Sequence, residues 1–280
     1  MKLLVTGVKG QLGYDIVNEC KKRNIETKGV DIDEMDITDA KKVKKVIKES
    51  NVDAIIHCSA YTAVDKAEDT IELCRDVNKN GTIHIVQVCE ELDIPIMYFS
   101  TDYVFSGEGD VAWKEYDQRT PLNIYGLTKY EAELVVENYP KHFIIRISWA
   151  FGINGHNFIK TMLRLGNERD EVSVVNDQIG SPTYTKDLAR LVVDMIQTDK
   201  YGTYHASNEG YCSWFDFASE IFKQANIDIK INPIDSNAFP TKAKRPKNSR
   251  LSKEELDKNG FERLPSWQDA LQRYLEELNK

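Results

Sequence analysis

The chain has 280 residues, of which 41% are apolar and 29% are charged, so it can bury a sizeable core. Its 37 basic and 45 acidic residues give a net charge of −8, which argues against a nucleic-acid binder because such proteins carry a basic footprint. No apolar run approaches the ~20 residues that cross a bilayer, and the opening residues lack a signal peptide's apolar region. We therefore expect a cytoplasmic protein without a nucleic-acid or membrane partner.

Short β-branched runs alternate with longer helical patterns through the first half of the chain. The expected strands are 2–6, 26–31, 54–57, 96–100 and 142–148, and the expected helices are 11–23, 40–50, 70–92 and 125–138. Such alternation predicts βαβ units, a parallel sheet and right-handed crossovers. The expected fold class is α/β, with a Rossmann-type doubly wound parallel sheet and a smaller α/β substrate lobe.

The alternation weakens after Trp149. The later patterns predict helices at 158–165, 186–197, 214–225 and 267–278, strands at 172–175 and 203–207, and an irregular connection containing Pro233, Pro240 and Pro246. We assign residues 1–149 to a dinucleotide-binding domain whose sheet is completed by about 171–200. Residues 150–170 and 201–280 are expected to form mostly the substrate-binding lobe.

A glycine-rich stretch lies where the first expected strand leads into the first helix. It reads Gly7-Val8-Lys9-Gly10-Gln11-Leu12-Gly13. Glycines permit a tight turn there and let backbone N–H groups approach a pyrophosphate at the helix N-terminus. Asp31 ends the second strand, where a carboxylate typically meets the adenosine ribose and repels the 2′-phosphate of NADP, so it favours NADH. The alternatives are an ordinary turn at the glycines and a capping role for Asp31.

Two further groups point to proton transfer. Tyr125 and Lys129 are four residues apart, so on a helix they share one face, and a neighbouring ammonium would lower the pKa of the phenol. Thr101 follows an apolar strand, and hydroxyls at that end of a strand face the ligand crevice of an open α/β sheet. Tyr125 and Thr101 could thus protonate and hold a carbonyl oxygen. An exposed pair and a turn-capping hydroxyl are the respective alternatives.

With these motifs the sequence resembles the extended short-chain dehydrogenase/reductase superfamily, and within it the family of dTDP-4-dehydrorhamnose reductases. The resemblance runs almost end to end, and beyond the motifs above it rests on 59–68, 146–149, 176–183 and 245–251. It implies NAD(P)H-dependent reduction of the C4 keto group of a dTDP-sugar substrate, dTDP-4-dehydro-L-rhamnose.

The resemblance also implies residue roles. Gly10, Gln11 and Leu12 would line the cofactor pyrophosphate, Asp36 and Ile37 the adenine, and Ala60, Tyr61 and Thr62 the nicotinamide side. Tyr125 would be the acid, Lys129 its partner and a ligand of the nicotinamide ribose, and the sugar would contact Thr101, Asp102, Tyr103 and Trp149. A helix start at Asp36 and a core position for Trp149 are the alternatives, and Arg245 could tie a loop or contact a diphosphate.

Several alternatives stay open. A nucleotide-sugar epimerase or dehydratase would share the scaffold, as would a non-catalytic regulatory subunit resembling that of methionine adenosyltransferase or a dinucleotide-binding protein of unknown substrate. The resembled family commonly uses NADPH, whereas Asp31 favours NADH. The five cysteines and five histidines lack ligand spacing, so no metal site is expected. A monomer and a homodimer are both compatible with the sequence.

Overall fold

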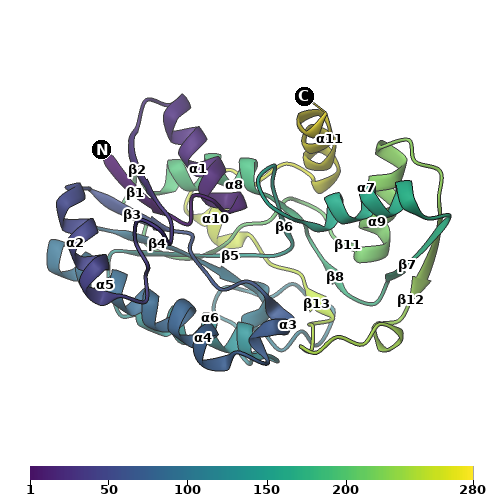
Figure 1. The fold of residues 1–280 in the computed structure, drawn as a ribbon, viewed down its shortest axis with the longest axis horizontal. Coiled ribbons are helices and arrows are strands. Elements are labelled where there is room, and N and C mark those ends of the chain that lie inside the picture. The colour runs from purple at the N-terminus through teal and green to yellow at the C-terminus, as the bar shows by residue number, and fades with distance from the viewer. Residues whose placement is uncertain (280) are drawn as a thin grey trace.

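The computed structural model describes residues 1–279 as a twisted parallel sheet covered by helices, with a smaller lobe at one end (Figure 1). The sheet has six parallel strands in the order β10-β5-β4-β3-β1-β2. Its strands are β1 Lys2–Thr6, β2 Glu26–Val30, β3 Ala54–His57, β4 Ile96–Thr101, β5 His142–Ile147 and β10 Gly202–His205. The α/β class and the doubly wound parallel sheet are thus confirmed.

Helices cover both faces of this sheet. The helices that follow the first five strands are α1 Gln11–Lys22, α2 Ala40–Ser50, α5 Gly81–Leu92, α6 Ile124–Glu137 and, after the lobe begins, α8 Thr185–Met195. Apolar residues of α1 and α8 pack together with one face of the strands, and those of α2, α5 and α6 pack with the other. The strands β3 and β4 are buried at every position, as expected of parallel strands covered on both sides.

The long helix expected over 70–92 is interrupted. It consists of α4 Ile71–Arg75, a π-helical turn over Asp76–Asn80 and then α5, while a short helix, α3 Val64–Ala67, precedes it. A π turn inserts one residue into the helical repeat, and such turns are frequent at functional sites. Hydrophobic periodicity does not reveal this insertion, because both flanking helices keep their own apolar faces.

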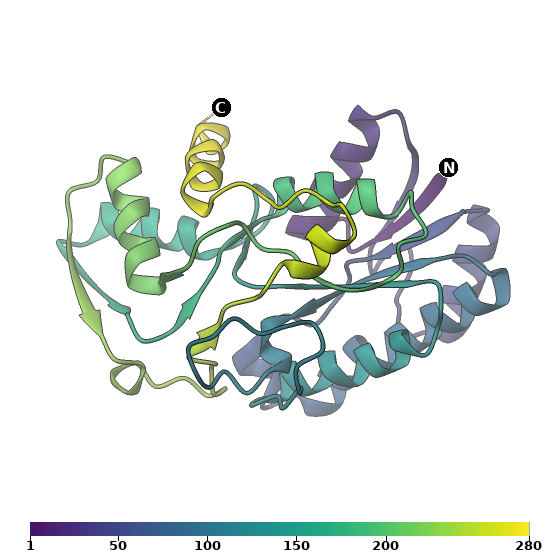
Figure 2. The same ribbon diagram turned by 180° about the vertical axis from the view of Figure 1, so that it is seen from behind.

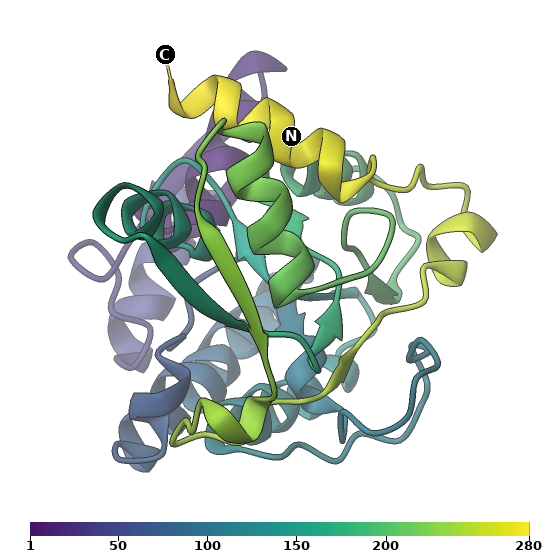
Figure 3. The same cartoon turned by 90° about the vertical axis from the view of Figure 1, so that its right-hand side faces the viewer.

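The smaller lobe has its own core. It is formed by α7 Phe158–Glu168, α9 Trp214–Gln224 and α11 Trp267–Leu278, packed against the parallel pair β7 Glu171–Val175 and β12 Lys230–Ile234 (Figure 3). Two more small sheets connect the lobe to the main sheet: β6 Ala150–Phe151 with β9 Thr183–Tyr184, and β11 Cys212–Ser213 with β8 Ile179–Gly180 and β13 Asn248–Ser249. From behind, the chain after β13 crosses from the lobe to the main sheet, where α10 Glu254–Lys258 lies beside β10 (Figure 2).

Two expectations about this region need correction. The sheet was expected to be completed within about 171–200, but the strand in that interval, β7, pairs with β12 in the lobe, and the sixth sheet strand is β10. Pro233, expected in an irregular connection, lies within β12. β12 pairs only with β7 among residues 1–279, so it is an edge strand and can accommodate a residue without an N–H group. The division into residues 1–149 and a lobe remains our proposal.

Candidate active site

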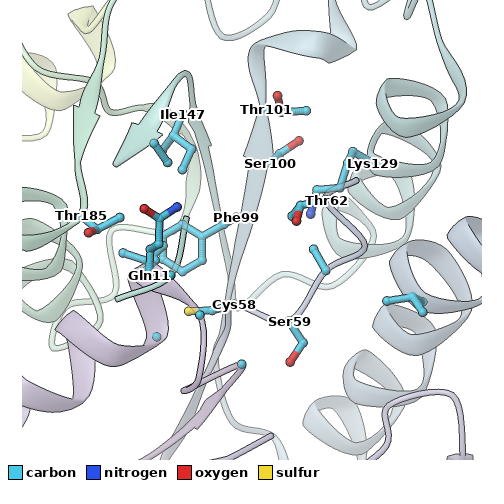
Figure 4. A pocket seen from close by; sticks show the side chains of 18 of the residues that line it. Gln11, Cys58, Ser59, Thr62, Phe99, Ser100, Thr101, Lys129, Ile147 and Thr185 are labelled. Atoms are coloured by element: carbon cyan, nitrogen blue, oxygen red, sulfur yellow. The ribbon is translucent and has the colours of Figure 1, made fainter. Parts of the chain in front are cut away.

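A cavity of about 820 Å³ opens at the carboxyl ends of the sheet strands, between the sheet and the lobe. Residues directly after β1, β2 and β3 and the last residues of β4 and β5 line it, together with residues of α1, α6 and the lobe. In the close-up, Phe99, Ser100 and Thr101 follow one strand between Gln11 and Thr185 on one side and Lys129 and Thr62 on the other (Figure 4). In an open α/β sheet this edge is where ligands bind.

Most residues singled out in the sequence meet in this cavity. Its lining includes Gly7, Gly10, Gln11, Leu12, Gly13, Asp31, Asp36, Ile37, Ala60, Thr62, Thr101, Asp102, Tyr103, Tyr125, Lys129 and Trp149. Tyr61 is not part of the lining; its hydroxyl lies 2.9 Å from that of Thr70. The sequence motifs between Gly7 and Trp149 therefore converge on one site.

The glycine loop is shaped to admit a phosphate group. Gly7 has φ +67°, which side chains rarely adopt, and a Cβ on Gly13 would lie 2.3 Å from the Gly7 carbonyl oxygen. The close approach brings the N-terminus of α1 against the loop, leaving backbone N–H groups at the cavity wall. A helix N-terminus with exposed N–H groups suits a pyrophosphate. A dinucleotide cofactor therefore fits these residues.

Asp31 faces the same loop. Its carboxylate accepts hydrogen bonds from the backbone N–H groups of Lys9 and Ile32, both at 2.9 Å. The Lys9 ammonium forms an ion pair with Asp33 rather than with Asp31. Asp31 thus caps backbone N–H groups, as one alternative held, and it also lines the cavity at the end of β2. Both roles fit one position, because each carboxylate oxygen can accept more than one hydrogen bond.

The polar end of β4 is held by its own side chains. The Thr101 hydroxyl donates to Asp102 Oδ1 at 3.0 Å and accepts from the backbone N–H of Tyr103 at 3.2 Å. Burial raises the pKa of Asp102 to about 6, although the Ser249 and Thr101 hydroxyls oppose the shift. Asp102 Oδ2 is buried and makes no hydrogen bond of standard geometry within the described residues, so it can accept one from a ligand hydroxyl.

Tyr125 and Lys129 occupy successive turns of α6. The Tyr125 ring packs edge-on against Tyr103 with centroids 5.7 Å apart, and the Asn123 side chain caps the helix by accepting from the Gly126 N–H. A Cβ on Gly126 would lie 2.3 Å from the Tyr103 carbonyl oxygen, so glycine lets α6 approach the end of β4. This close approach places the phenol beside Thr101 and Asp102.

The electrostatics differ from the simple expectation for a Tyr–Lys pair. Burial raises the pKa of Tyr125, the nearby Asp102 adds to this, and the Thr101 hydroxyl opposes it. Burial also lowers the pKa of Lys129 to about 7, against the opposing charge of Glu133. Lys129 does not lower the pKa of the phenol below its usual value in this structure, contrary to expectation. Tyr125 therefore carries a proton at neutral pH, as a general acid must, but a pKa above the usual value makes the phenol a weaker donor in this cofactor-free form.

Two stacked tryptophans form an aromatic wall of the cavity, and only one of them, Trp149, was expected from the sequence. Trp149 has φ +50°, and its ring stacks on that of Trp214 with centroids 3.8 Å apart. A Cβ on Gly180 would lie 2.9 Å from the Trp149 ring, so glycine makes room for it. Both tryptophans line the cavity, which favours the sugar-contact interpretation of Trp149 over a core position. Trp214 carried no signal beyond helical periodicity.

Arg245 ties a loop, one of the two alternatives considered for it. Its guanidinium donates to both carboxylate oxygens of Asp65, at 3.1 and 2.6 Å, and Asp65 also accepts from the backbone N–H of Ala243. The segment after β12 is thereby fastened to α3 beside the cavity. Within residues 1–279 no group of three or more histidine, cysteine or acidic residues could hold a metal ion. Over the same residues, no helix is both long and apolar enough to span a membrane.

The doubly wound sheet, the glycine loop and the Thr–Tyr–Lys set at one cavity define a protein of the short-chain dehydrogenase/reductase class. Residues 1–280 match the family described as RmlD substrate binding domain. The chain is 36% identical over 293 aligned positions to the dTDP-4-dehydrorhamnose reductase of Escherichia coli K12, covering 99% of this chain and 98% of that protein. The chain therefore belongs to the dTDP-4-dehydrorhamnose reductase family, which confirms the resemblance.

Solved structures agree with this assignment. A dTDP-4-dehydrorhamnose reductase from Clostridium acetobutylicum superposes with a TM-score of 0.98 at 40% identity over the whole of both chains. The dTDP-4-dehydrorhamnose reductase from Bacillus anthracis, in complex with NADP, superposes with a TM-score of 0.96 at 42% identity over 99% of both chains. The Thermus thermophilus UDP-glucose 4-epimerase, in complex with NAD, shares the fold alone, with a TM-score of 0.86 at 17% identity.

Proposed function

We propose that this protein reduces the C4 keto group of dTDP-4-dehydro-L-rhamnose to dTDP-L-rhamnose with NADPH or NADH. The observation that carries the proposal is the convergence of the glycine loop, Thr101, Tyr125 and Lys129 on one cavity in a chain of this reductase family. A relative at 42% identity is known in complex with NADP, which supports the cofactor class. We place the reaction in the cytoplasm, as one step in making nucleotide-linked sugars.

In this mechanism the chain's residues orient the substrate and move one proton. When bound, the reduced nicotinamide supplies the hydride that adds to C4. Tyr125 donates its proton to the oxygen on which charge develops, and Thr101 holds that oxygen by a hydrogen bond. Lys129 then offsets the charge left on the phenolate. Donors aimed at a charge that grows only in the transition state lower the barrier, and positioned proton transfer typically contributes ~10²–10⁴-fold.

The remaining cavity residues divide into two groups in this proposal. Cofactor contacts come from Gly7, Gly10, Gln11, Leu12, Gly13, Asp31, Asp36, Ile37, Ala60 and Thr62. Tyr61, expected on the nicotinamide side, does not line the cavity, and its backbone N–H and carbonyl are bonded to Asn78. Sugar contacts come from Thr101, Asp102, Tyr103 and Trp149, to which we add Trp214. Asp102 Oδ2 would accept from a sugar hydroxyl.

The test follows reduced-nicotinamide absorbance with purified protein and dTDP-4-dehydrorhamnose, using NADH and NADPH in parallel. Consumption of one cofactor per sugar reduced is the expected result. An epimerase would recycle its cofactor and leave the absorbance unchanged while converting the sugar. Tight dinucleotide binding with no change in either cofactor or sugar would instead favour the regulatory-subunit alternative. Size-exclusion chromatography with light scattering separates a monomer from a homodimer.

A further inference from the structure

A buried ion-pair cluster lies one helical turn beyond Lys129. The Glu133 side chain is fully buried, and its two carboxylate oxygens accept from Nε and Nη2 of Arg146, both at 2.8 Å. Arg119 Nη1 donates to the same carboxylate, also at 2.8 Å. Arg146 lies on β5 opposite Ser100 of β4, and Arg119 belongs to the segment before α6. Two segments outside α6 thus fix the Glu133 carboxylate in place.

Among residues 1–279, the buried Lys129 has no ion-pair partner of its own. It is 3% exposed, and no acidic group within residues 1–279 lies within ion-pair distance of its ammonium. Its Nζ sits 4.1 Å from the centroid of the Tyr98 ring. Tyr125, Lys129 and Glu133 are spaced four residues apart on α6, so they share one face of the helix. Glu133 is therefore the acidic residue one turn along from the ammonium.

We propose that Glu133 is a positioning residue of the reductase site: its buried carboxylate, held by Arg146 and Arg119, maintains the ammonium form of Lys129. The inference rests on the proposed function only for the role of Lys129 in turnover. The electrostatic relationship between the two side chains belongs to the protein itself. It can therefore be measured without cofactor or substrate.

The other titratable groups facing Lys129 are uncharged at neutral pH. Cys58 after β3 and Cys74 on α4 have thiols whose pKa burial raises, and burial likewise raises the pKa of Tyr98 on β4. Burial lowers the pKa of His57 on β3 to about 3, and the Lys129 charge adds to that shift. Tyr125, on α6 itself, stays protonated for the reasons given above. None of these supplies a negative charge.

Glu133 is ionised despite its burial. Burial alone would raise its pKa, but the paired guanidinium of Arg146 and the Ser100 and Arg119 side chains outweigh this and lower it. Since burial also lowers the pKa of Lys129 to about 7, a fixed negative charge nearby decides whether the amine keeps its proton. A buried Glu–Arg pair is weak evidence for a stabilising role. Because this pair lies one helical turn from Lys129, we assign Glu133 an electrostatic role instead.

The decisive experiment titrates the Lys129 amine in the cofactor-free protein. Carbon-13 labelling at the lysine Cε gives one NMR signal per lysine, and the Lys129 signal is identified by its loss in Lys129→Met. We expect Glu133→Gln to lower the titration midpoint by about one pH unit or more. Glu131→Gln is the matched control. It removes the same charge from the same helix, but Glu131 pairs with Arg75 and Lys79. The Lys129 midpoint in this variant should therefore equal that of the unaltered protein.

Arg119→Gln provides the opposite change. It removes one of the two cations on Glu133 and leaves the Arg146 pair intact, so the Lys129 midpoint should rise. Arg119 is 17% exposed, so its loss disturbs the core less than loss of Glu133. If Glu133→Gln does not fold, this variant decides the matter. Unchanged midpoints in Arg119→Gln, or in a folded Glu133→Gln, would overturn the proposal.

The pH profile of kcat/KM supplies a second readout. In Glu133→Gln the alkaline limb should move to lower pH along with the amine midpoint, and in Arg119→Gln to higher pH. A uniform loss of activity at all pH values, with an unmoved limb, would indicate a merely structural role and overturn the proposal. Failure of the proposed function itself would look different. It would abolish turnover in the unaltered protein and leave the NMR midpoints of the variants shifted as expected.

Discussion

Asn78 holds both backbone groups of Tyr61. Its Oδ1 accepts from the Tyr61 N–H at 2.7 Å, and its Nδ2 donates to the Tyr61 carbonyl at 3.2 Å. The same Nδ2 donates to Thr128 Oγ1 at 3.0 Å, and that hydroxyl donates to the Tyr125 carbonyl. One buried amide in the π turn thus joins the loop after β3 to α6, the helix that carries Tyr125 and Lys129. Asn78 therefore links two walls of the cavity through hydrogen bonds.

Replacing Asn78 with alanine should loosen both walls. We expect the free energy of unfolding to fall by about 1–3 kcal/mol, because buried polar partners lose their hydrogen bonds. kcat should fall as well, since Tyr125 is no longer fixed relative to the loop at Ala60 and Thr62. Urea denaturation and steady-state kinetics measure the two effects. Asn80→Ala is the control, because Asn80 lies in the same π turn but donates to Asp76; equal losses in both variants would contradict the assigned role.

The sequence predicted the parts of this site that depend on local pattern. Gly7 to Gly13, Thr101 and the Tyr125–Lys129 pair were found because strand ends and helical spacing determine where such residues lie. Asn78 was missed because its partners lie 17 and 50 residues away, and the π turn that aims it leaves hydrophobic periodicity unchanged. A long-range hydrogen bond has no signature in a single sequence.

The other differences between the sequence-based predictions and the structure come from contacts between segments that are distant in the chain. The strand at 171–175 was located correctly but placed in the wrong sheet, because its pattern does not say which strand it pairs with. Trp214 was expected only as a helical residue, and its place in the site comes from stacking on Trp149, which lies on another segment. Periodicity predicts which face of an element is buried. It does not predict which neighbour buries it.

Tyr125→Phe should lower kcat by about 10²–10⁴-fold, because it removes the donated proton and leaves the ring in place. Cofactor affinity, measured by quenching of protein fluorescence, should change little. Tyr130→Phe, one position after Lys129 on the same helix, is the control and should keep normal activity. Retention of more than about a third of the original rate by Tyr125→Phe would contradict the assignment of the acid.

Asp31→Asn should move cofactor preference toward NADPH. The amide oxygen of Asn can still accept from the Lys9 N–H, so the loop keeps its shape while one negative charge beside the ribose is lost. Removing about 1.4 kcal/mol of repulsion raises the ratio of kcat/KM for NADPH over NADH about tenfold. Asp33→Asn is a useful comparison because it releases the Lys9 ammonium from its ion pair. An unchanged ratio in Asp31→Asn would show that this carboxylate does not select the cofactor.

Asp102 should make stability depend on pH in an unusual direction. Burial raises its folded-state pKa to about 6, above the value of 3.8 in an unfolded chain. The folded state therefore binds the proton more tightly, and its contribution to stability is present below pH 3.8 and lost as the pH rises through 6. Two pKa units correspond to about 3 kcal/mol.

Asp102→Asn removes this titration. Relative to the variant, the unaltered protein should lose about 2–3 kcal/mol of unfolding free energy between pH 4 and pH 8. Urea denaturation of both proteins across that range measures the difference. Comparing slopes rather than absolute values removes the variant's own packing change. A difference that stays constant with pH would mean that Asp102 is ionised in the folded protein at the same pH as in the unfolded chain.

Trp214→Ala should weaken sugar binding without touching the cofactor side. Trp149 holds a left-handed backbone conformation, and such conformations cost about 1–3 kcal/mol unless the surroundings maintain them. The Trp214 ring, stacked at 3.8 Å, is one of those surroundings, and an aromatic pair contributes about 0.5–1.5 kcal/mol beyond its buried area. We expect KM for the dTDP-sugar to rise about 3–10-fold or more, with KM for NADPH unchanged. Phe215→Ala, at the neighbouring position of α9, is the control for helix damage. If both variants raise KM for the sugar equally, the effect belongs to the helix and not to the stacked pair.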